Sequence, residues 1–159
     1  MSNRKIIQGL LEDLKIQEGK QLKVMRAIDK LDKPGFGLKG VEDLLKKERK
    51  DKSGAVTKGA DLNNDQVLQI INFLKITELK ELKKNFKNPL TQQGINEIEE
   101  LYDVLTYGDF IDQVKTNFTI VRGLAYYDGF CVETNLKFKV SNSKGKEVDI
   151  GSICSGGQY

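Results

Sequence analysis

An arginine and two tyrosines stand close together in this chain and could bind a small anionic ligand. Arg122 precedes Gly123, so a fixed positive charge and a bare stretch of backbone could approach an anion together. Tyr126 and Tyr127 would point to opposite faces of an extended segment, with one ring in a pocket and the other packed behind it. The residues alone favour a simpler interpretation, in which the segment is a buried strand with a tight turn and ordinary core tyrosines.

The composition narrows the chemistry that these residues could perform. The chain has no histidine, which excludes imidazole general bases, catalytic triads that use histidine, and metal sites with histidine ligands. Its two cysteines, Cys131 and Cys154, are too few for a four-sulfur zinc site, and we expect them to be small buried thiols on neighbouring strands. Any chemistry must therefore use arginine, tyrosine and carboxylates.

Length and charge indicate a protein of modest size without a membrane segment. At 159 residues, the chain is long enough for one domain, or for a helical unit and part of another. No apolar run approaches the length of a membrane span and no signal-peptide block is present, so a cytoplasmic location is expected. The net charge of +3 permits contact with RNA but does not require it.

Apolar residues repeat at steps of three and four through the first two thirds of the sequence, which predicts helices. Their starts are expected at Ser2 or Asn3, after Gly19, at Asn63 or Asn64, at Thr77 and at Thr91. Residues 34–40 contain a proline and three glycines and predict a flexible passage, and the mixed charges of 46–52 indicate a solvated helix end.

The period changes from helical to extended in the last third of the chain. Leu136, Phe138 and Val140 alternate with lysines, which predicts a strand with one wet face. Residues 141–145 are typical of a hairpin turn, after which 148–154 would return antiparallel. The expected fold class is therefore α+β, with helices followed by a small antiparallel sheet.

One predicted helix carries a row of positive charge. Lys80, Lys83, Lys84 and Lys87 recur at three- and four-residue steps and would share the face opposite the apolar one. Such a row could lie along an RNA phosphate backbone, where each contact adds a salt-sensitive share of the affinity. A helix that simply keeps its lysines in water fits the same pattern equally well.

Three parts of the sequence, in the right order, resemble one family. Residues 122–127 resemble the histidine-binding signature of class II histidyl-tRNA synthetases, and 151–159 resemble the glycine-rich strand and turn that follow it. Residues 3–5 and 26–33 are similar to the segment that leads into the family's helical insertion, a module near the tRNA acceptor arm. The resemblance implies an internal fragment of such an enzyme.

The resemblance also implies a division of the chain into three parts. Lead-in helices of the catalytic domain would occupy 1–39, the helical insertion 40–108, and a partial catalytic antiparallel sheet with the histidine-binding motif 109–159.

The family joins histidine to ATP, with magnesium, as histidyl-adenylate and then transfers the histidyl group to tRNA. By resemblance, Arg122 would contact the α-phosphate and the histidine carboxylate, where a fixed guanidinium stabilises developing charge. The remaining substrate-binding positions implied by the motif are Tyr126, Tyr127, Gly156, Gly157 and Tyr159. No metal ligand is expected among these residues, and the parent enzyme would be a homodimer.

Two positions depart from the family pattern, because Ala125 replaces a common acid and Gln158 a common arginine. The first and second class II motifs and most of the third are not found in the sequence, so we expect no adenylate formation by this chain alone. Two other interpretations are a fragment of the synthetase-like regulatory subunit of ATP phosphoribosyltransferase, which is expected to lack the insertion, and a stand-alone RNA-binding module. Exposed sheet edges would favour self-association.

Overall fold

The structure is a computed structural model that describes residues 1–50, 54, 56–121, 126–148 and 150–159. Its helices are α1 (Arg4–Asp13), α2 (Glu18–Ile28), α3 (Gly37–Leu45), α4 (Asn64–Phe73), α5 (Leu79–Asn85), α6 (Pro89–Tyr107) and the 3-10 helix η1 (Ile111–Gln113). Its strands are β1 (Ser2–Asn3), β2 (Glu48–Lys50), β3 (Val56–Lys58), β4 (Phe130–Asn135), β5 (Val140–Ser141), β6 (Glu147–Val148) and β7 (Ser152–Gly157). None of the helices in the described part is long and apolar enough to cross a membrane.

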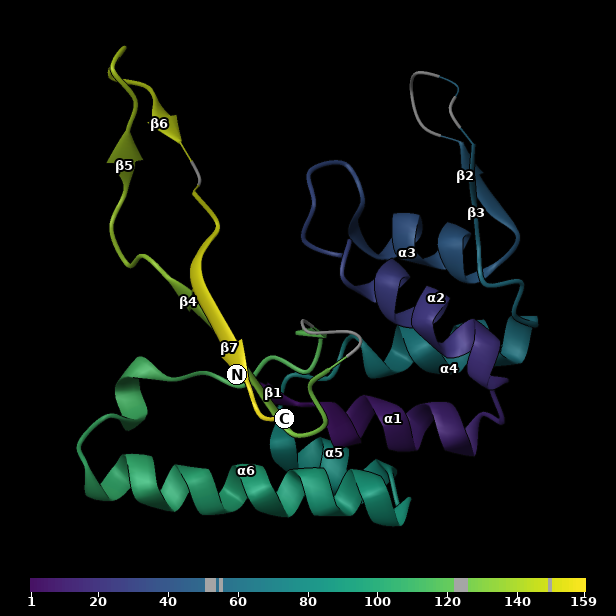
Figure 1. The fold of residues 1–159 in the computed structure, drawn as a ribbon, viewed down its shortest axis with the longest axis horizontal. Coiled ribbons are helices and arrows are strands. Elements are labelled where there is room, and N and C mark those ends of the chain that lie inside the picture. The colour runs from purple at the N-terminus through teal and green to yellow at the C-terminus, as the bar shows by residue number, and fades with distance from the viewer. Residues whose placement is uncertain (51–53, 55, 122–125, 149) are drawn as a thin grey trace.

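The principal sheet joins the two ends of the chain. Strand β4 lies between β1 and β7 and is antiparallel to both, with Ser2 opposite Cys131 and Val132 opposite Gly156. Beyond a register shift after Thr134, the chain continues into the β5–β6 hairpin, which projects away from the helices (Figure 1). The α+β class predicted from the sequence is confirmed, as is the antiparallel return after the turn.

Helix α1 packs against α6 with the two backbones in close approach. A Cβ atom added to Gly9 would lie 2.7 Å from Asn88 Oδ1 and 2.8 Å from the Thr91 backbone nitrogen. Thr91 is fully buried and donates from its hydroxyl to the Ile6 carbonyl over 3.3 Å. Gly94 occupies the corresponding place on α6, where a Cβ would meet Ile6 Cγ1 at 3.0 Å. The missing side chains therefore let the two helices meet at this crossing.

A half-buried carboxylate links the start of α1 to α6. Glu97 accepts hydrogen bonds from Asn3 Nδ2 at 2.7 Å, from Gln93 Nε2 at 3.0 Å and from the Lys5 ammonium. Burial would raise the pKa of Glu97, but these hydrogen bonds and the Lys5 charge together lower it below its usual value. Asn3 also accepts from the Lys5 backbone nitrogen and so caps α1. Asn3 thus caps α1 and, through Glu97, also links the start of α1 to α6.

The capping residues were predicted well in some helices and poorly in others. Asn3 caps α1, and Asn63 forms a capping box with Gln66 at the start of α4, so both predictions are confirmed. The prediction of Thr77 is wrong, because Glu78 is the N-cap of α5 and makes no side-chain capping bond. Helix α6 begins before the predicted Thr91, since Asn88 caps it ahead of a proline at its first position.

Two predicted irregular segments are ordered by contacts between residues distant in sequence. The flexible passage over 34–40 is wrong at its C-terminal half, because α3 begins at Gly37. In the predicted helix end over 46–52, Glu48–Lys50 instead form strand β2, which pairs with β3. The Arg49 guanidinium lies 3.6 Å from the centre of the Phe36 ring and donates to the Gly35 carbonyl at 3.0 Å. This contact holds the β2–β3 hairpin against the turn before α3.

Two further predictions concern the strand from Leu136 to Val140 and the division of the chain into three parts. The strand expected from Leu136 to Val140 is wrong over most of its length, because only Val140 lies in a strand and Phe138 is 69% exposed. No second layer among the described residues covers that alternating face. Helix α3 runs across residues 39 and 40, where the lead-in was expected to end, and the division into three parts stays a prediction.

The crossing of α1 and α6 gives a direct test of this packing. We expect Gly9→Ala to lower the free energy of unfolding by about 1–3 kcal/mol, since the added methyl group meets backbone that cannot move freely. Urea unfolding followed by circular dichroism measures the change.

The matched control is Gly19→Ala in the first turn of α2, where nothing lies within 4 Å of the added Cβ. This variant should be neutral or stabilised by up to about 1 kcal/mol, because alanine is the better helix former. Equal stability of the two variants would contradict the close packing.

Candidate ligand-binding site

Three tyrosine rings from two separate segments gather beside the end of β7. Tyr126 and Tyr127 have ring centres 4.6 Å apart, and Tyr159 lies 5.7 Å from the first and 5.4 Å from the second. Tyr126 and Tyr159 are 56% and 81% exposed, whereas Tyr127 is half-buried. Burial, and then the neighbouring tyrosines, raise the pKa of the Tyr127 hydroxyl. A tyrosine hydroxyl ordinarily titrates near pH ~10, so this one is protonated at neutral pH with or without the shift and can donate a hydrogen bond.

A bare glycine makes room for the most enclosed of these rings. A Cβ on Gly157 would lie 2.5 Å from both Cγ and Cε2 of Tyr127, so no larger residue fits with the ring in this place. Backbone bonds hold the two segments together: Asp128 N donates to the Gln158 carbonyl at 3.1 Å, and Gln158 N donates to the Phe130 carbonyl at 2.8 Å. The end of the chain and the tyrosine segment are thus fixed side by side.

The sequence-predicted site residues are only partly brought together. Tyr126, Tyr127, Tyr159 and Gly157 converge, as the resemblance implied. At Gly156, by contrast, a Cβ would meet Val132 Cγ2 at 3.7 Å. The predicted anion-binding Arg122 and the departure at position 125 lie outside the described residues, so the predicted roles of all these residues stay proposals.

Gln158, the other departure from the family pattern, contacts the residues that follow the tyrosines. Its side-chain oxygen accepts from Phe130 N at 3.4 Å, and its Cδ would lie 2.8 Å from a Cβ on Gly129. The glutamine therefore packs against Gly129, which is buried, in the turn that follows the tyrosines.

The two cysteines have different environments, and the prediction that both are buried is wrong for one of them. Cys131 is fully buried, burial raises its thiol pKa, and its Sγ lies 3.3 Å from the Ile120 carbonyl. Cys154 is exposed. The register places Cys131 opposite Gly157 and Cys154 opposite Thr134, so the thiols are not cross-strand neighbours, and both are free.

The predicted row of four lysines on one helix face is wrong, because α5 ends at Asn85 and Lys87 lies beyond its extended C-cap. Lys83 forms an ion pair with Glu99 of α6 at 2.7 Å, and Lys87 Nζ donates to the Lys83 carbonyl at 2.8 Å. Lys80 and Lys84 are exposed on α5. The predicted helical period holds for Lys80, Lys83 and Lys84, but the helix ends before Lys87.

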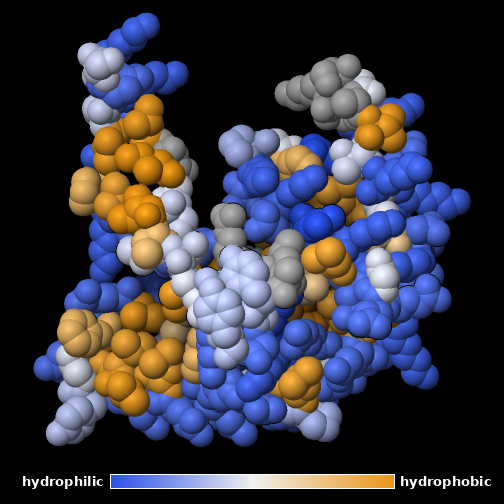
Figure 2. All heavy atoms as spheres, in the orientation of Figure 1, coloured by the Kyte–Doolittle hydropathy of each residue, from blue (hydrophilic) through white to orange (hydrophobic). Residues whose placement is uncertain are grey.

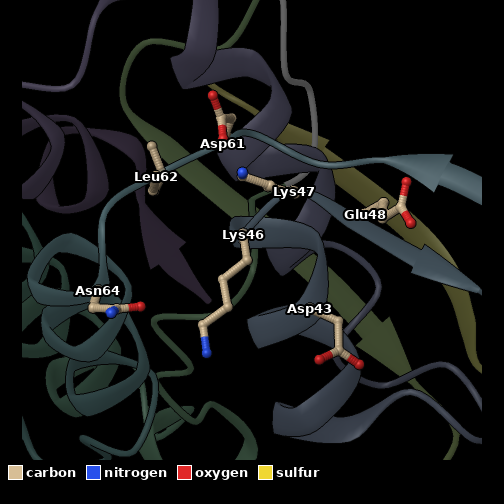
Figure 3. A pocket seen from close by; sticks show the side chains of 7 residues that line it. All are labelled: Asp43, Lys46, Lys47, Glu48, Asp61, Leu62 and Asn64. Atoms are coloured by element: carbon tan, nitrogen blue, oxygen red, sulfur yellow. The ribbon is translucent and has the colours of Figure 1, made fainter.

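A hollow that the sequence did not indicate lies between the end of α3, strand β2 and the segment before α4 (Figure 3). It has a volume of about 360 Å³ and is lined by Asp43, Lys46, Lys47, Glu48, Asp61, Leu62 and Asn64. Its lysines and carboxylates balance in charge to within one unit, so the hollow favours no single class of ligand. Among the described residues, no three His, Cys, Asp or Glu side chains gather as a metal site.

Apolar side chains are also exposed in two other places, visible along the β5–β6 arm and at the far end of α6 (Figure 2). Phe138 and Ile150 belong to the first group, and Tyr107, which is 96% exposed, belongs to the second together with Phe110.

Comparison with known proteins shows which protein class has this fold. No family model matches the chain. A solved structure, the histidyl-tRNA synthetase from Nostoc sp. PCC 7120, matches 98% of the chain with a TM-score of 0.70 and 26% identity, and the match covers 33% of that synthetase. The chain therefore has the fold of part of an aminoacyl-tRNA synthetase.

The sequences specify which synthetase. The chain is 76% identical over its whole length to the histidine–tRNA ligase of Pelagibacter ubique and 40% identical to that of Rhizobium meliloti. It belongs to the histidine–tRNA ligase family and spans about a third of the length of these relatives. The resemblance drawn from the sequence motifs is thereby confirmed.

The tyrosine cluster yields a paired prediction. Gly157→Ala should displace the Tyr127 ring and weaken two aromatic contacts, at a cost of about 1 kcal/mol in unfolding free energy. Because the chain has no tryptophan, near-ultraviolet circular dichroism reports its tyrosines and should lose intensity.

Gly156→Ala is the matched control on the same strand, since its added Cβ meets only Val132 at an ordinary contact distance. Its tyrosine spectrum should equal that of the unmodified chain. A similar loss in both variants would contradict the placement of the ring on Gly157.

Proposed function

We propose that this chain supplies the histidine-binding wall of a histidine–tRNA ligase, the enzyme that forms histidyl-adenylate from histidine and ATP and charges tRNA. One observation carries the proposal: three tyrosines converge where Gly157 of β7 makes room for the Tyr127 ring, in a chain 76% identical to such a ligase.

The tyrosines suit the recognition of an imidazole. The Tyr127 ring is oriented between Gly157 and the other two rings, and its hydroxyl, protonated at neutral pH like that of any tyrosine, donates to an unprotonated imidazole nitrogen. Tyr126 offers a second hydroxyl, and Tyr159 covers the group from the solvent side. A site that pairs the imidazole nitrogens rejects apolar side chains, because each buried polar group left unpaired costs about 1–3 kcal/mol.

Arg122 completes the proposed site from outside the described residues. We assign it to the α-phosphate of ATP and the histidine carboxylate, since a guanidinium stays charged at any working pH and stabilises the developing negative charge. ATP with magnesium, tRNA, a homodimeric parent and a cytoplasmic location belong to the same proposal. The described residues supply no cluster of metal ligands, so no step is assigned to a metal held by them.

A hybrid enzyme tests this proposal. The chain replaces the 159 residues that it matches in the Pelagibacter ubique ligase, and histidine-dependent ATP–pyrophosphate exchange and tRNA charging are measured. We expect both activities in the hybrid. The chain alone should give no exchange, because catalysis needs several further groups to orient the substrates. Charging of tRNA also separates the ligase from a regulatory subunit that binds histidine only.

Tyr127→Phe in the hybrid keeps the ring on Gly157 and removes the hydroxyl. It should raise the KM for histidine about tenfold and leave the KM for ATP unchanged, because one buried hydrogen bond to the substrate is lost. Tyr107→Phe, at a ring that is 96% exposed on α6, is the control and should change neither constant. Full activity of the hybrid with an unaltered histidine KM in Tyr127→Phe would refute the tyrosine assignment.

A contact with tRNA remains a separate proposal for α5, and its observed basis is the exposure of Lys80 and Lys84. Lys83 and Lys87 stay part of this proposal with a smaller contribution, because both are engaged within the protein. Changing Lys80 and Lys84 to glutamate should weaken binding of a tRNA acceptor hairpin and reduce the salt dependence of the affinity by about two phosphate contacts.

The control for this measurement is the same reversal at Lys23 and Arg26 on α2, which are also exposed. Equal losses in the two double variants would show a general charge effect and would sink the assignment to α5.

A further inference from the structure

We propose that Arg4 is a positioning residue, which fixes the described residues Val121 and Gly129 and thereby orients Tyr126 and Tyr127 next to Gly129. The inference rests on the proposed function of those tyrosines in histidine binding. Arg4 is the first residue of α1, is 3% exposed and is far in sequence from the residues that it contacts.

Two hydrogen bonds from this one residue reach Val121 and Gly129. Arg4 Nη1 donates to the Val121 carbonyl at 3.1 Å, and the Arg4 backbone nitrogen donates to the Gly129 carbonyl at 2.8 Å. Because both donors belong to a single buried residue, the separation between these carbonyls is set by the geometry of the arginine. The segment between them carries the residues of the histidine-binding signature.

The position of Arg4 is itself determined by other parts of the structure. Asn3 pairs with Phe130, caps α1 and binds Glu97 of α6 at 2.7 Å. The amino group of Met1 donates to the Lys115 carbonyl at 2.6 Å, so the chain is anchored on both sides of the arginine. Arg4 is therefore held by β1 and α6 and can impose a position on the segment.

A chain of contacts connects Gly129 to the tyrosine rings. Gly129 is buried, and the neighbouring Asp128 donates to the Gln158 carbonyl at 3.1 Å. On its other side, the Tyr127 ring lies against Gly157, where an added Cβ would be only 2.5 Å from its Cγ. A shift of the Gly129 carbonyl would thus move both the ring and the strand end that carries Tyr159.

The chemistry of the Arg4 side chain indicates that it positions other groups and does not merely fill space. Burial of a guanidinium carries a desolvation cost, seen here as a lowered Arg4 pKa, and an apolar side chain of similar length would fill the space without it. What the arginine adds is a rigid, planar group of donors, one of which is directed at the Val121 carbonyl. A lysine supplies one mobile charge in place of that group.

The test compares Arg4→Met, Arg4→Lys and Gly9→Ala, the last being a destabilised variant remote from the tyrosines. In the hybrid ligase, Arg4→Met should raise the KM for histidine about fivefold, as expected for one lost orienting hydrogen bond, with the KM for ATP unchanged. Arg4→Lys should fall between Arg4→Met and the unmodified hybrid. Gly9→Ala should lower only the amount of active enzyme, with both constants unchanged.

A second measurement does not depend on the proposed enzyme activity. In the 159-residue chain, well below the unfolding midpoint, Arg4→Met should lose near-ultraviolet tyrosine signal, whereas Gly9→Ala keeps it. An unchanged tyrosine spectrum in Arg4→Met overturns the positioning role. An unchanged histidine KM in an active hybrid overturns it as well. An inactive hybrid refutes the proposed function and leaves the spectrum to decide whether Arg4 orients the tyrosines.

Discussion

The pairing of β1 with β4 is the contact on which the arrangement of this chain depends. Only Ser2 and Asn3 take part, and they pair with Cys131 and Phe130 near the other end of the sequence. Such a pairing is costly to close, because all of the intervening chain is confined by it. It is stabilised by what surrounds it, namely the helix cap at Asn3, the Glu97 network and the fully buried Cys131. The short strand thus joins the helices to the sheet.

Glycines determine how closely the layers on either side of this strand approach one another. Gly9 and Gly94 allow α1 and α6 to meet, and Gly157 admits the Tyr127 ring. None of these glycines has the positive φ that would call for glycine on conformational grounds, so their role is one of space. The same physical device therefore serves packing in the helical layer and the placement of a candidate ligand-binding ring in the sheet.

Periodicity predicted the elements whose stability is local and failed where distant contacts decide. Helices α1 and α4 have long apolar faces and asparagine caps, and both were found from the sequence. Strands β1 and β2 are two and three residues long and carry no alternation that could be read, since a partner strand or the Phe36–Arg49 contact forms them. The alternating Leu136–Val140 run has the pattern of a half-buried strand, but the partner layer that would make it one is not among the described residues.

The motif located the candidate site in the sequence, but it did not show which residues position the tyrosines or how exposed their rings are. The resemblance placed Tyr126, Tyr127 and Tyr159 together. It included Arg4 only within residues 3–5 and did not link this arginine to the tyrosines, because an arginine at a helix start is ordinarily a surface residue. The exposure of the rings then limits what they can do. With Tyr126 at 56% and Tyr159 at 81%, water competes for the hydroxyls, and a hydrogen bond in water contributes little to affinity. Selective binding of an imidazole, as proposed, therefore requires a second wall that excludes water. The relatives, of which this chain spans about a third, have the additional length to provide one.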